Sequence, residues 1–233
     1  MSIDKLRHLA RTRRELITVA AQKVAAQQLA DRIVGSPIYQ HSRHIAVYWA
    51  VGGEISVEPL IERAWQAGKQ CYLPVVRHQS LIFVPYDQNT LMHKNRFGIP
   101  EPVNCENAFA AAELDLVLTP LVAFDQECHR IGMGGGYYDR TFAFLQAQSN
   151  TREMKQKKEA GDVLLALASQ EAVQKKPLQK ENVQKALKEI PKPFLMGVAH
   201  SCQQVDMIKP ESWDVSLNSI YTDLKKIAVG QFS

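Results

Sequence analysis

The stretch Arg130–Arg140 (RIGMGGGYYDR) combines residue types and a spacing that suit the binding of a phosphate group. Its four glycines have no Cβ to block a ligand, and they permit positive φ angles that let successive backbone N–H groups converge on one anion. A helix that begins just after the loop would add the partial positive charge of its N-terminus. Asp139 supplies a carboxylate where a Mg²⁺ ion carried by a nucleotide needs an oxygen ligand. The stretch therefore predicts a phosphate cradle beside a metal ligand.

An ordinary tight turn is the alternative interpretation of a glycine run, and the glycines alone do not decide between the two. The Walker pattern requires Gly-Lys-Ser/Thr, a tripeptide that the sequence lacks. The Rossmann fingerprint requires a glycine where Tyr137 stands. The loop is therefore neither a standard NTPase site nor a standard dinucleotide site.

The elements that position this loop are predicted from hydrophobic periodicity and from capping residues. The apolar run Leu114–Phe124 indicates a buried strand before the loop, and Thr141–Leu145 indicates the start of a helix after it. Residues 3–33 carry apolar side chains at helical spacing and predict one helix. A second helix is expected from a cap at Ser56 to Trp65. Further strands are predicted at His44–Trp49, Gln70–Val76, Leu81–Tyr86 and Phe194–His200. This alternation predicts an α/β fold in which helical layers enclose a largely parallel central sheet, α/β/α.

The segment from about 146 to 192 differs in composition from the rest of the chain. It is rich in Gln, Lys, Glu and Ala and contains no aromatic residue. We interpret it as a solvated, partly helical insertion within a single domain that spans residues 1–233, in preference to a partner-binding element.

Composition limits the size of the core and the classes of ligand and site that the chain can have. A chain of 233 residues with 45% hydrophobic content is sufficient for one sizeable core. A net charge of +4 favours anionic small ligands and does not require nucleic acid. No two of the four cysteines form a CxxC pair, so neither a zinc ribbon nor a thioredoxin motif is indicated, and Cys71 and Cys128 are interpreted as unreactive. Without a signal-like segment or a long apolar run, a cytoplasmic protein that does not enter membranes is expected.

The loop as a whole resembles the signature of the 5-formyltetrahydrofolate cyclo-ligase family (5,10-methenyltetrahydrofolate synthetases), whose bacterial members carry a string like RLGxGGGYYDR. The resemblance extends to Ile45–Pro74, to Phe97–Pro102 (FGIPEP) and to the C-terminal block Gly197–Asp223. It implies a monomer that uses ATP and Mg²⁺ to cyclise 5-formyltetrahydrofolate to 5,10-methenyltetrahydrofolate, with release of ADP and phosphate. Positioning and charge stabilisation would supply most of the rate in such a phosphoryl transfer, and no dedicated acid or base is assigned.

The resemblance also implies which residues bind ATP. The N-terminal cations Lys5 and Arg7 correspond to a Lys/Arg cluster of the family. Arg7 is the safer assignment, because Leu6-Arg7 aligns with the Leu-Arg pair of the family motif. The remaining ATP contacts are predicted at Arg130, Ile131, Gly132, Met133, Gly134, Gly135, Gly136, Tyr137 and Tyr138. Some relatives carry a lysine where this chain has Gly135, so the cation for the terminal phosphate is expected from Arg130 or Arg140.

Folate is expected to border the same loop, because the terminal phosphate must meet the formyl oxygen there. The folate contacts that the resemblance predicts are Trp49, Glu54, Met133, Gly134, Gly135, Gly136 and Tyr137. A carboxylate at Glu54 suits the adjacent N–H donors of a pterin ring. Core packing remains an alternative for Trp49.

Asp139 and Asp214 are the Mg²⁺ ligands implied by the resemblance, although the sequence alone favours an ordinary helix or turn cap for Asp214. His200 is interpreted as a structural histidine. Three other functions remain open. They are an ATP-dependent enzyme of the same fold that acts on another N-acyl substrate, a non-catalytic folate- or nucleotide-binding protein, and a sugar-phosphate isomerase-like protein that needs no ATP.

Overall fold

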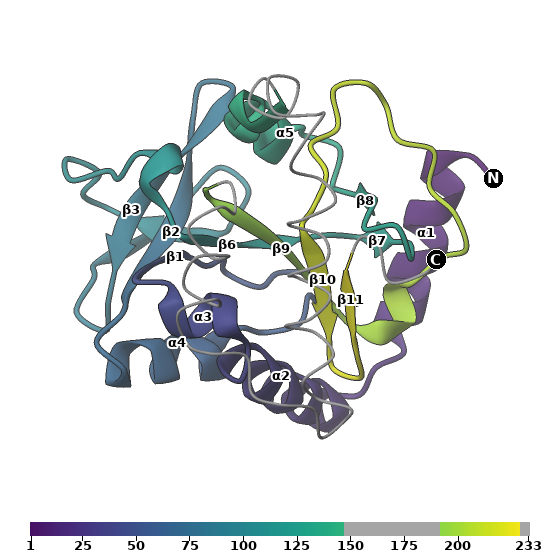
Figure 1. Ribbon diagram of the computed structural model, residues 1–233, viewed down its shortest axis with the longest axis horizontal. Helices are drawn as coiled ribbons and strands as arrows, with labels where there is room; N and C mark the ends of the chain where they lie inside the picture. The colour runs from purple at the N-terminus through teal and green to yellow at the C-terminus, as the bar shows by residue number, and fades with distance from the viewer. Residues whose placement is uncertain (147–191, 229–233) are drawn as a thin grey trace, which may run out of the picture.

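The computed structural model describes residues 1–146 and 192–228, which form a seven-stranded sheet with helices on its faces (Figure 1). The strand order is β11-β10-β9-β6-β1-β2-β3. The bounds of these strands are β1 His44–Ala46, β2 Gln70–Arg77, β3 Ser80–Tyr86, β6 Leu116–Pro120, β9 Phe194–Ala199, β10 Ser219–Thr222 and β11 Lys226–Ala228. The predicted insertion lies outside the described residues, apart from its two ends.

The centre of the sheet is parallel. β10, β9, β6, β1 and β2 run in the same direction, and β11 and β3 add antiparallel strands at the two edges. Strands β6 and β9 are buried on both faces and consist almost entirely of apolar residues, as is typical of parallel strands between helical layers. The predicted α/β fold with a largely parallel sheet is confirmed.

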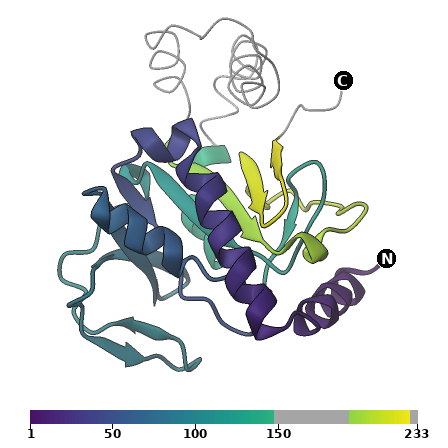
Figure 2. The same cartoon turned by 90° about the horizontal axis from the view of Figure 1, so that it is seen from below.

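Helices cover both faces of the sheet (Figures 1 and 2). α2 (Val19–Val34), α3 (Pro37–His41) and α4 (Glu58–Gln66) lie on one face, and their core centres on Leu29, Ile33 and Leu60. The short α5 (Tyr137–Phe142) lies on the other face. Its core includes Phe83, Phe124 and Phe142. Together the two faces make the expected α/β/α layering.

The N-terminal region differs from the prediction of one helix over residues 3–33. It forms α1 (Ile3–Glu15) and α2, which are separated by Leu16, Ile17 and Thr18. The Thr18 side chain accepts a hydrogen bond from the Ala21 N–H at 3.2 Å and so caps the second helix. The apolar spacing continues through the break, and this concealed it in the sequence. The break frees α1 to pack on the short strand pair β7 (Ala123–Phe124) and β8 (Arg130–Ile131).

Three other boundaries differ from the predictions. The strand expected at His44–Trp49 ends at Ala46. The apolar run Leu114–Phe124 is divided into β6 and β7, because β7 leaves the main sheet to pair with β8. The helix expected from Thr141 begins at Tyr137, inside the signature stretch.

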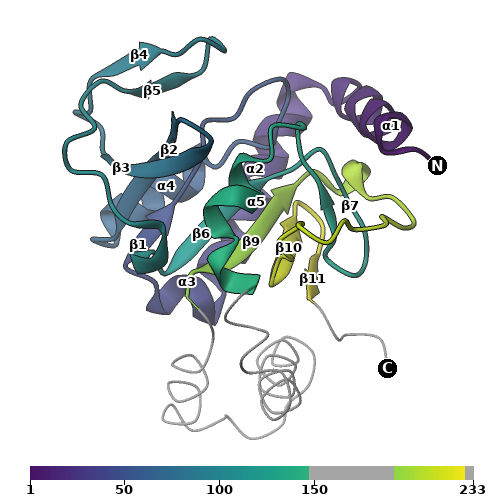
Figure 3. The same ribbon diagram turned by 90° about the horizontal axis from the view of Figure 1, so that it is seen from above.

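An arm extends from the sheet beyond β3 (Figure 3). It is the antiparallel pair β4 (Met92–Lys94) and β5 (Pro100–Pro102). Short 3₁₀ turns η1 and η3 cover Ala111–Glu113 and Ser201–Gln203. Within the described part of the chain, no helix is long and apolar enough to cross a membrane.

Candidate active site

The strand order places a topological switch point between the ends of β1 and β6. The chain leaves β1 toward α4 on one face of the sheet, and after β6 it proceeds through the β7–β8 pair to α5 on the other face (Figure 1). Ligands of open α/β sheets bind at such switch points, outside the carboxyl ends of the strands. This topology directs the turn at Gly52–Glu54 and the glycine loop to the same edge.

Helix α1 joins these two segments. Arg7 donates to the Gly132 carbonyl at 3.0 Å, and Arg14 lies 3.7 Å from a Cβ built on Gly53. Burial raises the pKa of Tyr138, the second residue of α5, and the carboxylate of Glu54 raises it further, in keeping with this arrangement.

The glycine loop has the backbone conformation that the sequence predicted. Gly134 has φ +101° and Gly136 has φ +63°, both in the region that side chains rarely adopt. Gly136 forms the N-cap of α5, and its carbonyl accepts the Arg140 N–H at 3.0 Å. Met133, Gly134 and Gly135 are exposed, so this part of the loop is open to a ligand.

The space beside two of the glycines is filled by the loop's own side chains, and this revises the sequence interpretation. A Cβ on Gly135 would lie 2.8 Å from the ring of Tyr137, and a Cβ on Gly136 would lie 2.6 Å from Nη1 of Arg140. Nothing lies within 4 Å of a Cβ built on Gly132. Gly135 and Gly136 therefore serve the packing of Tyr137 and Arg140 in addition to any ligand.

Two arginines of α1 contact the loop. Arg7 donates from Nε to the Gly132 carbonyl at 3.0 Å and forms an ion pair with Asp4 at 2.7 Å. Arg11 points Nη2 at the sulfur of Met133 at 3.4 Å, and a thioether is only a weak acceptor. The exposed Lys5 side chain forms no hydrogen bond or ion pair with the loop among the described residues.

Sequence reasoning missed Arg11, although helical spacing contained the signal. Arg11 stands four residues after Arg7, and residues so spaced lie on one side of a helix. The two arginines expected to replace the loop lysine are already engaged. Arg130 pairs with Asp139 and donates to the Val215 carbonyl. Arg140 donates to the carbonyls of Gly135 at 2.6 Å and Gln79 at 2.5 Å.

The two predicted metal ligands lie in contacting segments. Oδ1 of Asp139 accepts the N–H of Val215 at 3.1 Å, and Val215 directly follows Asp214. Oδ2 of Asp214 accepts the Glu211 N–H at 2.8 Å. Oδ2 of Asp139 and Oδ1 of Asp214 have no hydrogen-bond partner among the described residues.

No group of three or more metal-ligating side chains occurs within residues 1–146 and 192–228. Two carboxylates with free oxygens fit an ion that arrives on nucleotide phosphates, which keeps most of its coordination sphere on phosphate and water. They do not form a closed protein cage for Mg²⁺.

Glu54 lies half-buried in the turn after β1, and its Oε2 accepts the Val51 N–H at 3.1 Å. Burial raises the pKa of Glu54, against the lowering effects of the Val51 N–H and of Arg14. Trp49 is 41% exposed and is therefore no core residue, which removes the alternative that the sequence left open. Both residues remain available to a ligand.

The β4–β5 arm reaches the same site. Arg96, near its tip, donates from Nη2 to the hydroxyl of Tyr137 at 3.1 Å. The cation of Arg140 lies over the ring of Tyr137, 5.1 Å from its centroid. Tyr137 thus contacts two arginines, whereas Tyr138 is partly buried and packs against the core that contains Phe142.

His200 follows β9 and is buried, as expected of a structural histidine. Its backbone N–H donates to Oε1 of Gln203 at 2.9 Å, and burial lowers its pKa. The two buried thiols, Cys71 and Cys128, have pKa values raised to about 12 by burial, consistent with unreactive positions.

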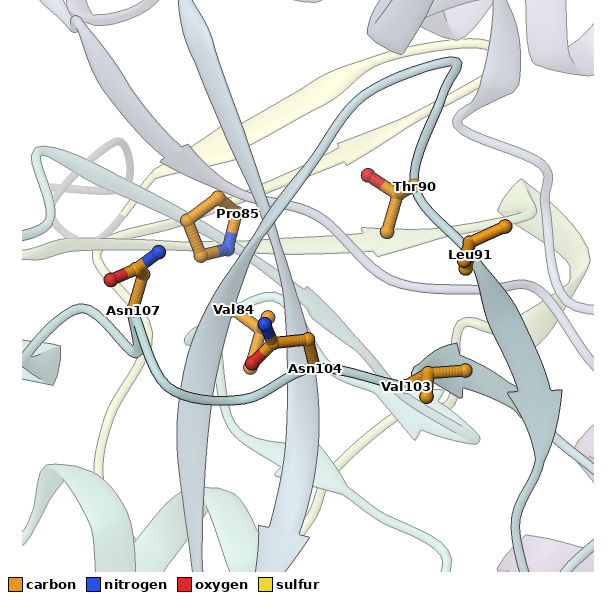
Figure 4. A pocket seen from close by; sticks show the side chains of 7 residues that line it. All are labelled: Val84, Pro85, Thr90, Leu91, Val103, Asn104 and Asn107. Carbon is orange, nitrogen blue, oxygen red and sulfur yellow. The ribbon is translucent and has the colours of Figure 1, made fainter.

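A separate pocket of 270 Å³ lies between β3 and the β4–β5 arm (Figure 4). Its lining residues are Val84, Pro85, Thr90, Leu91, Val103, Asn104 and Asn107. None of them belongs to the predicted site, so this pocket is separate from the switch point at the strand ends.

Comparison with known proteins decides the family. The model of the 5-formyltetrahydrofolate cyclo-ligase family matches residues 2–184. The chain belongs to this family.

Members of the cyclo-ligase family from two bacteria resemble it along most of its length. The protein of Escherichia coli (strain K12) is 31% identical over 219 residues, which cover 92% of this chain and 97% of the relative. That of Haemophilus influenzae is 33% identical over 208 residues, covering 88% of each chain. The resemblance drawn from the glycine loop is confirmed.

Solved structures give the same fold. The NMR structure of Aquifex aeolicus 5,10-methenyltetrahydrofolate synthetase aligns with a TM-score of 0.70 at 21% identity, covering 100% of this chain and 95% of that chain. A 5,10-methenyltetrahydrofolate synthetase from Mycoplasma pneumoniae aligns with a TM-score of 0.62 at 19% identity, covering 96% of this chain. The layered architecture described above is thus the cyclo-ligase architecture.

Proposed function

We propose that this protein cyclises 5-formyltetrahydrofolate to 5,10-methenyltetrahydrofolate in an ATP- and Mg²⁺-dependent reaction that releases ADP and phosphate. The observation that carries the proposal is that α1 joins the two segments: Arg7 donates to the Gly132 carbonyl at 3.0 Å, and Arg14 lies against the Gly52–Glu54 turn. A reaction between a folate and a nucleotide phosphate needs the two binding segments side by side. Membership of the cyclo-ligase family supports the same substrates.

The chemical difficulty lies in the formyl group, which is an amide with a poor leaving group. Transfer of the terminal phosphoryl group of ATP to the formyl oxygen would form a P–O bond as the bond to ADP breaks. Attack of folate N10 on the activated carbon would then close the ring, with loss of the N10 proton to solvent and departure of phosphate. Protein groups need only position the reactants and stabilise charge.

Each residue has a role that fits its place. The exposed loop from Met133 to Gly135 would surround the phosphates with backbone N–H groups. Arg7 and Arg11 from α1 would supply positive charge there, in place of the lysine that this loop lacks. On the folate side, Glu54 would accept the adjacent N–H groups of the pterin, and the exposed Trp49 would wall the ring.

The free oxygens of Asp139 and Asp214 would hold Mg²⁺, which would neutralise developing charge on the phosphates when bound.

We further propose a cytoplasmic monomer whose partners are small molecules, with no role for nucleic acid or membranes. The modest net charge of +4 is in keeping with small anionic ligands.

Absorbance in the methenyltetrahydrofolate band tests the function directly. Purified protein, 5-formyltetrahydrofolate and Mg²⁺ are mixed with and without ATP. Growth of the band only with ATP is the expected result, together with release of one phosphate per turnover. Folded protein that binds ATP but produces no band would contradict the proposed reaction and favour another N-acyl substrate. Binding of folate without turnover would favour a sequestering role.

A further inference from the structure

Arg14, near the end of α1, has an environment that is unusual for an arginine. It is 4% exposed, and its Nε and Nη1 atoms are buried with no hydrogen-bond partner among the described residues. A guanidinium remains charged at any ordinary pH, and a buried charge without partners opposes folding. Such a group in a native protein calls for an explanation.

Arg14 lies on the buried face of α1, where the other buried side chains are apolar. Leu6, Ala10 and Arg14 are the buried residues of α1 and recur every fourth position, so Arg14 stands where an apolar side chain would fit. Arg13, the preceding residue, is exposed and donates to the Gln204 carbonyl at 3.0 Å, as a surface arginine does. The fold therefore keeps at position 14 a charge that packing alone does not require.

The Arg14 side chain lies against the turn that carries Glu54. A Cβ built on Gly53 would lie 3.7 Å from Cγ and Nε of Arg14, and one built on Gly52 would lie 3.7 Å from Nη2. Gly52 and Gly53 have φ angles of +55° and +78°, a backbone shape that favours glycine. The guanidinium thus contacts the backbone immediately before Glu54.

Three segments contribute to the electrostatic environment of Glu54. Arg14 of α1 lowers the pKa of Glu54, against the larger raising effect of burial. Glu54 raises the pKa of Tyr48, after β1, and of Tyr138, of α5, in each case after the larger effect of burial. Burial lowers the pKa of His200, and Arg14 lowers it further. Arg14 is a cation that lies directly against the turn that carries Glu54.

We propose that Arg14 is a positioning residue for folate: its buried guanidinium supports the Gly52–Glu54 turn from the protein side and supplies the countercharge of the Glu54 carboxylate. This role rests on the proposed function, because it assumes that Glu54 meets folate. Arg7 and Arg11 contact the glycine loop, whereas Arg14 contacts the Glu54 turn. One helix thereby serves the nucleotide side and the folate side with different arginines.

The test compares Arg14→Met and Arg14→Gln with Arg14→Lys and with the matched surface control Arg13→Met. The neutral variants should raise KM for 5-formyltetrahydrofolate by about tenfold or more, a loss of roughly 1.4 kcal/mol, with KM for ATP within about twofold. Their Tm should change by less than about 5 °C, because Nε and Nη1 of Arg14 have no hydrogen bond to lose among the described residues. Arg14→Lys should recover part of the loss, and Arg13→Met should behave as wild type.

The pH profile adds a readout that a structural role would not move. Without Arg14, the pKa of Glu54 loses a lowering influence, so the acid limb of kcat/KM for 5-formyltetrahydrofolate should shift to higher pH. An active wild type with an unchanged KM for folate in both neutral variants would overturn the role of Arg14 alone. A Tm lower by more than about 5 °C in both would make Arg14 a structural residue and also overturn it. An inactive wild type would overturn the proposed function, and this role with it.

Discussion

The carboxylate of Asp139 accepts the backbone N–H of Val215 at 3.1 Å, across 76 residues of sequence. The contact ties the first turn of α5 to the segment that contains Asp214, the second proposed metal ligand. Arg130, whose side chain is 7% exposed, pairs with the same carboxylate and donates to the Val215 carbonyl. Asp139 therefore has a structural role, and the metal role proposed for it must be separated from that role by experiment.

Asp139→Asn should reduce turnover by about a hundredfold or more, because a charged oxygen near the phosphates is lost. It should also lower the free energy of unfolding by roughly 1.5–3 kcal/mol, since Arg130 loses its charged partner. Assays well below the Tm of the variant separate the two effects. Full activity in the folded variant would remove Asp139 from the site.

Asp214→Asn provides the matched comparison, because the Asp214 carboxylate accepts only the local Glu211 N–H among the described contacts. Its Tm should change little, while the Mg²⁺ concentration needed for half-maximal activity should rise. Activity measured across a Mg²⁺ titration gives this value. An unchanged Mg²⁺ requirement would leave Asp214 as a turn residue.

Glu54→Gln should raise KM for 5-formyltetrahydrofolate by about tenfold while KM for ATP stays within about twofold, because the amide cannot accept two N–H groups as a charged carboxylate does. Equal changes in both constants would contradict a folate-specific role. Steady-state kinetics with each substrate varied in turn measures both.

The pKa of Glu54 gives this prediction a pH dependence with a defined sign. Burial raises that pKa in the folded protein, so the protonated form is favoured by folding. The contribution of Glu54 to stability is present below its unfolded pKa and is lost as pH rises through the raised value. The Tm of wild type relative to Glu54→Gln should therefore rise as pH falls through this window, while kcat/KM for folate falls. Parallel pH profiles of the two proteins would contradict this assignment.

Gly197→Ala in β9 should destabilise the fold by about 1–3 kcal/mol through overpacking. A Cβ there would lie 2.5 Å from Leu217 Cδ1 and 3.0 Å from both Ile220 Cγ1 and Leu121 Cδ2. Gly35→Ala is the control, because its φ is −68° and the nearest atom to its Cβ is 3.5 Å away. It should be neutral or stabilising by about 0.4–1 kcal/mol. Urea unfolding measures both, and equal midpoints would refute the packing argument.

Thiol labelling should distinguish the cysteines by their environment. Burial raises the pKa of Cys71 and Cys128 to about 12, so almost no thiolate is present at neutral pH and the reagent has no access. Iodoacetamide should modify Cys105 in the native protein and all four thiols after unfolding, as measured by mass spectrometry. Rapid native labelling of Cys128 would show that the core around it opens.

Much of the architecture could be predicted from local patterns. Apolar runs such as β6 and β9 are continuous because both faces are buried, and this pattern indicated a parallel sheet between helices. The positive φ angles of Gly134 and Gly136 agree with the glycine-rich loop before α5. The break between α1 and α2 escaped prediction because the apolar spacing runs through it, while Thr18 and tertiary packing decide where the helix ends.

The sequence by itself determined the kinds of element, the glycine-rich loop before α5 and the family. It did not determine which charges are buried or paired. Arg14 looks like any surface arginine in the sequence, and its burial follows from the way α1 packs beneath the Gly52–Glu54 turn. The pairing of Asp139 with Arg130 and Val215 likewise depends on α5 and the C-terminal block meeting beside the sheet. Local periodicity is set by neighbouring residues, whereas the surroundings of a charge are set by segments far apart in the chain, which only the strand order of the folded sheet brings together.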